Sequence, residues 1–385
     1  MKKYKLGDIL ELQRGYDLPH SEMEEGNVPV AGSSGIIGYH SISKIDPPCI
    51  TIGRSGSVGK LFFYNEAIWP HNTSLYIKSF KNNNEKYIFY LLKTVDFERL
   101  CDSSVVPSLN RNFVYPIKVP FYDNIADQQK IAAVLSSLDD KIALNNRINA
   151  KLEQMAKRLY DYWFVQFDFP NTDGNPYKSS GGKMVWNEIL KREIPDGWEV
   201  GNLYDIAEYV NGLACQNYRP KESEKSLPVI KIREMNEGIT ADTEKVSASI
   251  PGKYRIYAGD ILFSWSASLE IKIWTGETGG LNQHIFKVIP KGYFSKGYVY
   301  QQLSAYLVNF QKMAESRKTT MGHITSDHIK QSRILIPPKE IISAFTKKTL
   351  SIFNYQLSIE KETQKLTALR DRLLPLLMNG QVEVK

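Results

Sequence analysis

Residues 6–15 read LGDILELQRG and residues 203–212 read LYDIAEYVNG, so one short pattern occurs twice at an offset of 197. Residues 50–57 match residues 261–268 at an offset of 211, and residues 72–76 match residues 282–286 at 210. Residues 152–159 match residues 366–373 at 214. Because these offsets stay in a narrow band and keep the order of the chain, they predict an internal duplication.

Each copy has two parts. The first is a series of short β-branched and aromatic runs interrupted by Gly, Pro and Asn, which is typical of a small mixed α and β domain. The second is one long helix, and no Pro or Gly occurs between Ile125 and Phe169. Apolar residues recur every seven positions in both helical segments, which predicts that the two helices form a coiled coil. The heptad positions are Ile131, Leu138, Asn145, Leu152 and Leu159 in the first helix and Phe345, Ile352, Ile359, Leu366 and Leu373 in the second, with Val134, Ile148, Met155, Tyr355, Leu369 and Leu376 beside them.

Asn145 is the polar exception in this seam. One interpretation is that it fixes the register of the helix pair, as single buried polar residues do in coiled coils. The other is that the helix turns slightly and leaves Asn145 in water. The sequence leaves both open.

Composition limits the class of protein. The chain has 385 residues with 42% hydrophobic and 24% charged, which are globular values. Its net charge of +7 permits nucleic-acid binding without demanding it. The apolar runs are too short to span a bilayer, so we expect no membrane segment. The cysteines Cys49, Cys101 and Cys215 lie far apart, so a disulfide framework is not expected and a reducing cytoplasm is the expected location.

Three segments imitate enzyme motifs. Residues 53–60 look like a phosphate-binding loop, but five residues separate the outer glycines and Leu61 follows the lysine, where the motif needs four residues and Ser or Thr. Residues 46–49, DPPC, lack the aromatic residue of the adenine-methyltransferase tetrapeptide. His323 and His328 are five apart with no Cys or acidic partner for a metal. We therefore predict no catalytic residues and no metal site.

A duplicated domain on a rigid helical pair suits an extended, periodic target such as duplex DNA. Base edges are read by Arg, Lys, Asn, Gln, Ser and Thr. The alternative for every candidate is a structural role, since matched Gly and Asn residues also mark turns that a fold needs. The candidate DNA-binding residues are Arg54, Ser55, Ser57, Lys60, His71, Asn72, Asn110 and Arg111 in the first copy and Ser264, Trp265, Ser266, Asn282, Gln283, His284, Arg317, Lys318, Thr319, Thr320 and His323 in the second.

Several blocks of the chain together resemble a type I restriction-modification specificity (S) subunit. They are residues 127–142 (DQQKIAAVLSSLDDKI), 152–157 (LEQMAK), 195–200 (PDGWEV), 334–338 (ILIPP) and 373–380 (LLPLLMNG). The resemblance covers the whole chain. It departs from the family pattern at the start, where Met1 stands and a Trp is expected before the first Leu-x-Asp-Ile block.

The resemblance implies an α+β fold with a pseudo-twofold internal repeat, in which two tandem target-recognition domains are separated by two long helices forming an antiparallel coiled coil. The expected segments are a first target-recognition domain at 1–123, a central helix at 124–168, a linker at 169–200, a second target-recognition domain at 201–337 and a C-terminal helix at 338–385. Each domain is expected to read one half of a bipartite DNA site, while the helices set the spacer.

The resemblance also implies the partners. Two methylation (M) subunits would dock on the helices, and restriction (R) subunits would join this core. S-adenosylmethionine, ATP and magnesium are expected on those partners and none on this chain, which would not itself be an enzyme. Two alternatives remain, a stand-alone DNA methyltransferase or nuclease and a coiled-coil scaffold that binds only proteins.

Aromatic residues cluster at the end of the first helix. We predict that they anchor a partner, since such clusters often do; the alternative is that they cap the coiled coil locally. The cluster is Tyr160, Tyr162, Trp163, Phe164 and Phe167.

Overall fold

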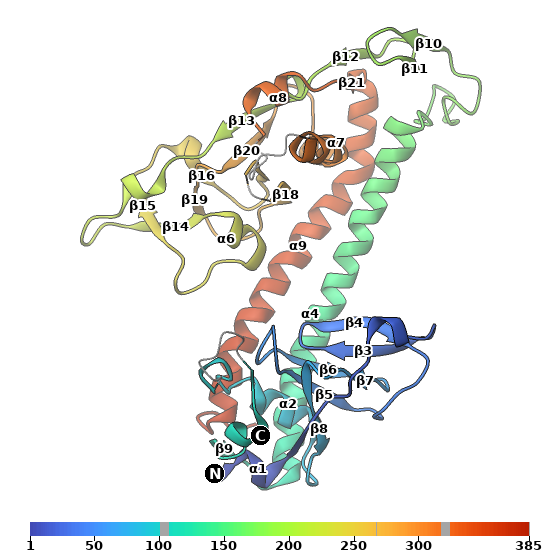
Figure 1. Cartoon of the computed structure of the whole chain (residues 1–385). Coiled ribbons are helices and arrows are strands. Elements are labelled where there is room, and N and C mark those ends of the chain that lie inside the picture. The colour runs from blue at the N-terminus through green and yellow to red at the C-terminus, as the bar shows by residue number, and fades with distance from the viewer. Residues whose placement is uncertain (101–107, 267, 317–323, 385) are drawn as a thin grey trace. The chain divides into compact units, whose positions relative to one another are not determined.

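The computed structural model describes residues 1–100, 108–266, 268–316 and 324–384 (Figure 1). The chain divides into two compact units. The first comprises Met1–Ala143 and Lys365–Lys385, and the second comprises Leu144–Gln364. Each long helix therefore contributes residues to both units, which differs from the expected division into domains and separate helical segments.

The first unit contains a four-stranded sheet of order β2-β8-β5-β6 and a three-stranded sheet of order β4-β3-β7. A third pair joins β1 to β9. The strands are β1 (Lys2–Lys5), β2 (Glu11–Arg14), β3 (Val28–Gly32), β4 (Gly35–His40), β5 (Cys49–Gly53), β6 (Leu61–Tyr64), β7 (Trp69–Pro70), β8 (Ser74–Ser79) and β9 (Lys118–Phe121). The short helices are α1 (Leu6–Ile9), α2 (Glu85–Leu92) and α3 (Arg111–Val114), with 3-10 turns at His20–Glu22 and Glu98–Leu100.

The second unit repeats this plan with sheets of order β13-β20-β17-β18 and β15-β14-β19-β16 and a β12-β21 pair. Its strands are β10 (Met184–Asn187), β11 (Arg192–Pro195), β12 (Glu199–Gly201), β13 (Ala207–Asn211), β14 (Ser226–Ile230), β15 (Lys245–Ser247), β16 (Arg255–Ile256), β17 (Ile261–Ser264), β18 (Glu270–Ile273), β19 (Gly279–Leu281), β20 (Ile285–Pro290) and β21 (Ile334–Ile336). Its short helices are α5 (Leu203–Ile206), α6 (Ile232–Glu237) and α8 (Ser326–Lys330), with 3-10 turns at Cys215–Tyr218 and Gly252–Tyr254, and a longer helix, α7, spans Lys296–Ser316.

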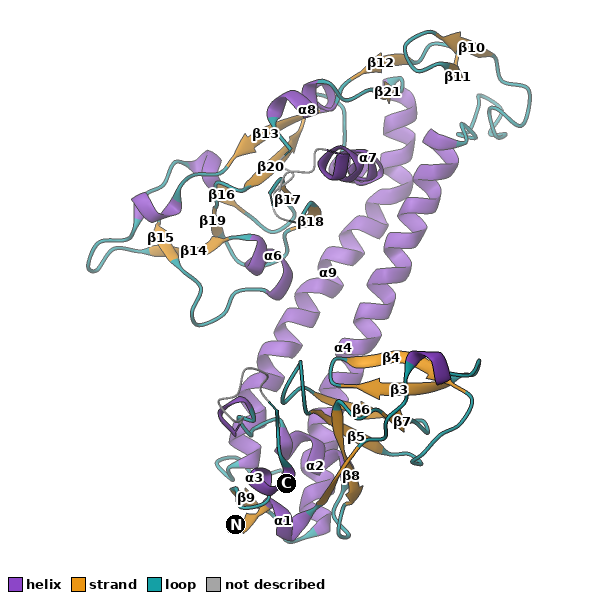
Figure 2. Cartoon of the chain, viewed as in Figure 1, coloured by secondary structure: helices purple, strands orange, loops and turns teal. Residues whose placement is uncertain are grey.

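The two units share a common topology, to which the second unit adds β16 in its smaller sheet and the β10-β11 hairpin. The sheets β2-β8-β5-β6 and β13-β20-β17-β18 are antiparallel, and in the other sheet of each unit β3 pairs in parallel with β7 as β14 does with β19. Both units contain strands together with short helices, and runs of strands such as β3 to β8 and β16 to β20 follow one another without an intervening helix (Figure 2). The prediction of a duplicated α+β fold is confirmed.

The repeated Leu-x-Asp-Ile motif is a short helix with its own cap. The Asp8 carboxylate accepts a hydrogen bond from the backbone N–H of Lys5, and Asp205 accepts one from Asn202 at 2.7 Å. An acceptor at this position satisfies an N–H that the first helical turn leaves unpaired. The flanking Leu and Ile of each motif are buried in their unit's core.

The long helices α4 (Ile125–Tyr160) and α9 (Lys339–Met378) pair antiparallel, as predicted. In the first unit Arg370 donates to Asp139 at 2.8 Å. In the second unit the Asn145 side chain donates to Glu362 at 2.9 Å and Asn149 donates to Glu360 at 3.0 Å. Within that unit the residue number of the α9 partner falls as the residue number along α4 rises, which defines an antiparallel pair. A π-helical turn, Asp161–Val165, continues α4.

The predicted heptad seam is partly correct. Its main positions are buried or half-buried, including Asn145, which is only 1% exposed. The interpretation that Asn145 is solvated is therefore wrong, because its amide lies in the seam bonded to Glu362. Three of the neighbouring positions, Met155, Tyr355 and Leu369, are about half exposed, so their prediction as seam residues is also wrong. Two helices bury only a narrow stripe of each other, and these three residues lie outside it.

The segment predicted as a linker has structure of its own. Strands β10 and β11 form an antiparallel hairpin, and β12 then pairs with β21. Among the described residues, no helix combines the length and apolar character needed to cross a membrane.

Candidate nucleic-acid interface

One glycine in each unit holds a strand against a neighbouring turn. A Cβ atom at Gly15 would lie 2.1 Å from the carbonyl oxygen of His71, and a Cβ at Gly212 would lie 2.0 Å from that of Asn282. Only glycine permits such a close backbone approach. Gly15 and Gly212 are the last residues of the repeated blocks 6–15 and 203–212, so the repeat marks the base of an equivalent turn in each unit.

Backbone hydrogen bonds build the turn in the first unit. The N–H groups of Arg54 and Ser55 both donate to the carbonyl of Thr73, at 2.8 and 3.2 Å, and the N–H of Leu109 donates to the carbonyl of Arg54 at 2.8 Å. These bonds bring together the loop after β5, the turn before β8 and the segment that leads into α3. We call this set of segments the first reading cluster, residues 53–57, 71–73 and 108–111.

Side chains of the first reading cluster are held at its surface. The Arg54 guanidinium donates to the carbonyl of Asn72 at 3.4 Å, the Asn72 amide bonds to Asp17, and Arg111 donates to the carbonyl of Leu12 at 3.2 Å. Asn110 caps α3 by accepting from the N–H of Asn112. These groups are oriented by the protein and still have donors to offer, which suits contacts to phosphates and base edges.

His71 lies half-buried in the same turn, 3.0 Å from the Thr73 hydroxyl. Burial lowers the pKa of His71 below its ordinary value of 6.5, because removal from water disfavours the charged ring; its contact with Leu18 and the charge of Asp17 partly oppose this. The imidazole is therefore neutral at pH 7 and offers one donor and one acceptor.

The second unit repeats the backbone bonds with different side chains. The N–H of Trp265 donates to the carbonyl of His284 at 3.3 Å, and the N–H of Ile324 donates to the carbonyl of Trp265 at 3.1 Å. The Trp265 indole donates to Asn211 at 3.1 Å and lies against the His284 ring, with 5.6 Å between ring centroids. We call residues 264–266, 282–284 and Asn211 the second reading cluster.

The predicted residues separate into three groups. Ser264, Ser266 and Asn282 are at most 7% exposed; the Ser264 hydroxyl donates to the carbonyl of Ser266, and the Asn282 amide oxygen accepts from the N–H of His284, so these residues shape the turn and their contact with DNA stays a prediction. Arg317, Lys318, Thr319, Thr320 and His323 lie outside the described residues. The others are half-buried or exposed in the clusters or beside them, and their role stays a prediction: Arg54, Ser55, Ser57, Lys60, His71, Asn72, Asn110, Arg111, Trp265, Gln283 and His284.

Two residues of these surfaces were missed. Asn211, which holds Trp265, directly precedes Gly212, and Arg14 occupies the equivalent place before Gly15. Arg14 is exposed, and its guanidinium lies 3.8 Å from Asp17. The signal was present in the repeat alignment, where the residue before each glycine is polar and differs between copies.

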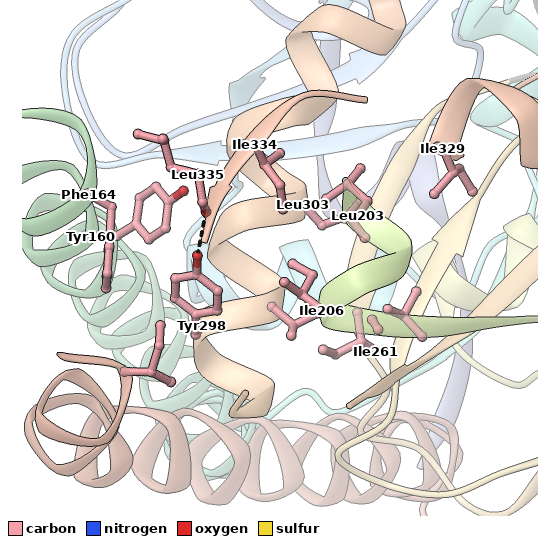
Figure 3. Close-up of a cluster of buried hydrophobic side chains, with 14 of the residues drawn as sticks. Tyr160, Phe164, Leu203, Ile206, Ile261, Tyr298, Leu303, Ile329, Ile334 and Leu335 are labelled. Carbon is pink, nitrogen blue, oxygen red and sulfur yellow. Dashed lines mark hydrogen bonds between the residues drawn. The ribbon is translucent and has the colours of Figure 1, made fainter. Parts of the chain in front are cut away.

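The aromatic residues at the end of α4 are mostly internal. Tyr160, Trp163, Phe164 and Phe167 are at most 5% exposed and pack in the core of the second unit, with Phe164 5.0 Å from Phe345 between ring centroids. Figure 3 shows Tyr160 and Phe164 in this core beside Tyr298. Apolar residues of α7, α9 and the segment that leads into β12 cover these four, which favours the alternative that they pack locally; their role in anchoring a partner stays a prediction. Tyr162 remains exposed.

The enzyme-like segments have structural roles. Residues 53–60 form the hairpin loop between β5 and β6, closed by the bond from Gly53 N–H to the carbonyl of Lys60. Cys49 is buried at the start of β5, and its thiol bonds to the carbonyl of Asp46 at 3.1 Å. Among the described residues, no cluster of three or more His, Cys, Asp or Glu side chains is arranged to hold a metal ion.

This architecture defines a class of protein, a duplicated α+β chain with an antiparallel pair of long helices. Each unit has a loop cluster with the same backbone hydrogen bonds but different side chains. The family model described as "Type I restriction modification DNA specificity domain" matches residues 1–154 and 195–369. The chain belongs to this family.

Individual relatives agree. The chain is 30% identical over 315 residues to the type I restriction enzyme HindI specificity subunit of Haemophilus influenzae, an alignment covering 67% of this chain and 68% of that protein. It is 26% identical over 312 residues to the MjaIX specificity subunit of Methanocaldococcus jannaschii, covering 78% and 69%. The crystal structure of the S subunit from M. genitalium superposes with a TM-score of 0.63 at 14% identity, covering 98% of this chain and 96% of that one, and so shares the fold.

Proposed function

We propose that this chain is the DNA-specificity subunit of a type I restriction-modification system and that each reading cluster recognises one half of a bipartite site. The observation that carries the proposal is the pair of clusters themselves. Equivalent backbone bonds place Arg54 in one unit where Trp265 stands in the other. A protein that reads two different sequences with two copies of one domain needs this combination of a constant scaffold and variable side chains.

The helix pair supports the second part of the proposal, that α4 and α9 set the spacer between half-sites. Polar contacts fix the register of the pair, through Asn145 and Glu362 in the second unit and Asp139 and Arg370 in the first. A buried polar residue in such a seam favours one register over its neighbours. We propose that a fixed register gives one spacer length.

The third part concerns partners. We propose that the chain has no catalytic activity, that two methylation subunits bind it, and that restriction subunits join through them. S-adenosylmethionine, ATP and magnesium would then be bound by those partners. The purified chain alone, incubated with DNA, magnesium and S-adenosylmethionine, is expected to leave the DNA unmethylated and uncut; methylation or cleavage would instead favour a stand-alone enzyme.

The decisive experiment is a domain exchange in cells. Residues 201–337 are replaced by the corresponding segment of a relative, and adenine methylation is mapped across the genome. One half of the methylated motif should change while the other half and the spacer remain. A change in both halves would refute independent reading by the two units. If no methylation in the cells depended on the unmodified gene, the alternative of a scaffold that binds only proteins would remain.

A further inference from the structure

A pocket of about 340 Å³ opens in the second unit where the end of α4 meets α7, β11 and β21. Its walls include the aromatic rings of Tyr160, Phe164 and Trp198. Figure 3 shows Tyr160 and Phe164 on one side, with Tyr298 directed toward the backbone of Leu335. The volume is at the lower end of the range for sites that receive a ligand or an inserted side chain.

Two arginines, Arg192 of β11 and Arg333 before β21, also line the pocket. None of the described lining residues is acidic. In the part of the chain that the structure describes, neither arginine forms an ion pair: Arg192 lies over the Phe167 ring at 5.4 Å, and Arg333 donates only to backbone carbonyls, the nearer being Ser332 at 3.1 Å. The pocket therefore carries two positive charges that this unit does not balance.

A buried amide adds a third donor. Gln302 is 9% exposed, and its side-chain oxygen accepts hydrogen bonds from the hydroxyls of Tyr160 at 2.9 Å and Tyr298 at 3.3 Å. Its amide nitrogen has no hydrogen bond to any other described residue, although Gln302 lines the pocket. Burial raises the pKa of Tyr160, the charge of Asp161 adds to this, and the charge of Arg192 partly offsets it.

The fold does not require this amide. Tyr87 of α2 and Tyr298 of α7 are equivalent, since the N–H of each donates to a side chain three residues earlier, Asn84 and Ser295. By the same offset Gln302 corresponds to Leu91, which is fully buried and apolar. In the first unit a leucine fills this position, whereas in the second unit the same position presents a polar group to a pocket.

The rim favours a protein as occupant. Val165 lines the pocket and is 50% exposed, and Ile189, next to the lining residue Leu190, is 63% exposed. A phosphate backbone would leave these apolar side chains in water, whereas a polypeptide covers them. Aromatic walls with arginines are also typical of the centre of protein interfaces, and paired guanidinium groups match a carboxylate.

We propose that this pocket binds an acidic segment of the methylation subunit, in which an Asp or Glu carboxylate meets Arg192 and Arg333 and a neighbouring aromatic or aliphatic side chain enters between the rings. This inference rests on the proposed function. It moves the expected contact from the buried aromatic residues of α4 to the arginines and apolar rim around them.

The test uses the full chain and the cognate methylation subunit, with binding measured by titration against fluorescently labelled chain. The variant Arg192→Glu/Arg333→Glu reverses both charges. Its matched control is Lys191→Glu/Lys330→Glu, which makes the same change in net charge at exposed neighbours that do not line the pocket and pair only with Glu188 and Asp327 at the surface. We expect at least tenfold weaker binding for the pocket variant and less than a twofold change for the control.

A second variant keeps the charges. Gln302→Leu copies the first unit and should weaken binding severalfold, and thermal unfolding of each variant verifies that the unit is folded. Equal binding by the pocket variant and the control, whether both are normal or both weak, overturns the proposal. Normal assembly with loss of DNA binding by the assembled complex would also overturn it and assign the arginines to DNA. Failure of the unmodified chain to bind the methylation subunit would instead count against the proposed function.

Discussion

Replacing Gly15 or Gly212 by alanine should damage one reading cluster at a time. In either variant the new methyl group meets a backbone carbonyl, of His71 in the first unit and of Asn282 in the second. A backbone carbonyl in a hydrogen-bonded turn cannot rotate away as the end of a flexible side chain can. The turn must therefore shift away from the strand.

The size of the shift follows from the geometry. Observed Cβ atoms essentially never approach another heavy atom closer than 3.0 Å, and the Gly15 position offers 2.1 Å, so the strand and turn must separate by roughly 1 Å. This movement strains the bonds from Gly15 N–H to Ser74, at 3.0 Å, and from Tyr16 N–H to Pro70, at 2.8 Å. Overpacking costs about 1–3 kcal/mol and each weakened backbone bond about 1 kcal/mol, so we expect about 3–5 kcal/mol of local destabilisation.

The effect on recognition should be confined to one half-site. A misplaced cluster loses contacts worth about 1–3 kcal/mol for each base pair, which is about a fivefold to 150-fold loss of affinity for one base pair. The assay measures binding of the assembled complex to duplexes in which one half-site or the other is scrambled. Gly15→Ala should become insensitive to scrambling of the first half-site while keeping its response to the second, and Gly212→Ala should do the reverse.

Gly252→Ala is the control, because a Cβ there meets no atom within 4 Å. It should bind as the unmodified chain does. Two results would refute the assignment of this turn to base recognition. Gly15→Ala could reduce discrimination between intact and scrambled sequences equally at both half-sites, or it could leave discrimination unchanged at both half-sites while its thermal unfolding is normal.

Other predictions concern the helices and His71. Asn145→Ala should destabilise the second unit by about 1–3 kcal/mol in thermal unfolding, because it removes a buried hydrogen bond to a carboxylate. Asn145→Leu should recover most of that loss, since an apolar side chain suits the seam. Equal losses in both variants would mean that the amide itself is essential. Because the pKa of His71 is lowered in the folded state, the unfolded chain binds the proton more readily, and the free energy of unfolding should fall as the pH drops below 6.5. The variant His71→Gln should reduce this dependence of stability on pH. An unchanged dependence would show that His71 is not its source. Four residues inserted in α4 between Asn145 and Leu152, with four opposite them in α9, lengthen each helix by ~6 Å. They should lengthen the spacer of the methylated motif by one to two base pairs, since base pairs rise ~3.4 Å, and an unchanged spacer would show that the helices do not set it.

The duplication could be predicted from the sequence because it rests on local rules. A capped Leu-x-Asp-Ile turn, a glycine at a close backbone approach and a seven-residue apolar period each need only neighbouring residues to be recognised. The alignment of the copies was nevertheless wrong by one residue at one turn. It paired Asn72 with Asn282, whereas the contacts of Gly15 and Gly212 make His71 the counterpart of Asn282. Two asparagines in similar surroundings gave a chance match that only strand register could correct.

Burial at turns and at helix ends could not be predicted in the same way. Ser264 follows a buried strand, and whether its hydroxyl faces solvent or bonds to the carbonyl of Ser268 depends on the path of the loop. The aromatic stripe of α4 was recognised, but the residues that cover it, among them Trp198, Tyr298 and Phe345, come from distant parts of the chain. Periodicity identifies an apolar face and does not say whether the same chain or a partner covers it.

The clusters also explain how two readers can diverge without losing their common fold. Arg54 and Trp265 are held by the same pair of bonds, one from their own N–H to a turn carbonyl and one to their own carbonyl from the segment that follows. Both bonds use backbone atoms, which every non-proline residue supplies. Mutation can therefore exchange a guanidinium for an indole, or Arg14 for Asn211, while the scaffold keeps its register. Under the proposed function, a new half-site would need changes only in the side chains that the constant backbone presents, and the other unit would keep its own half.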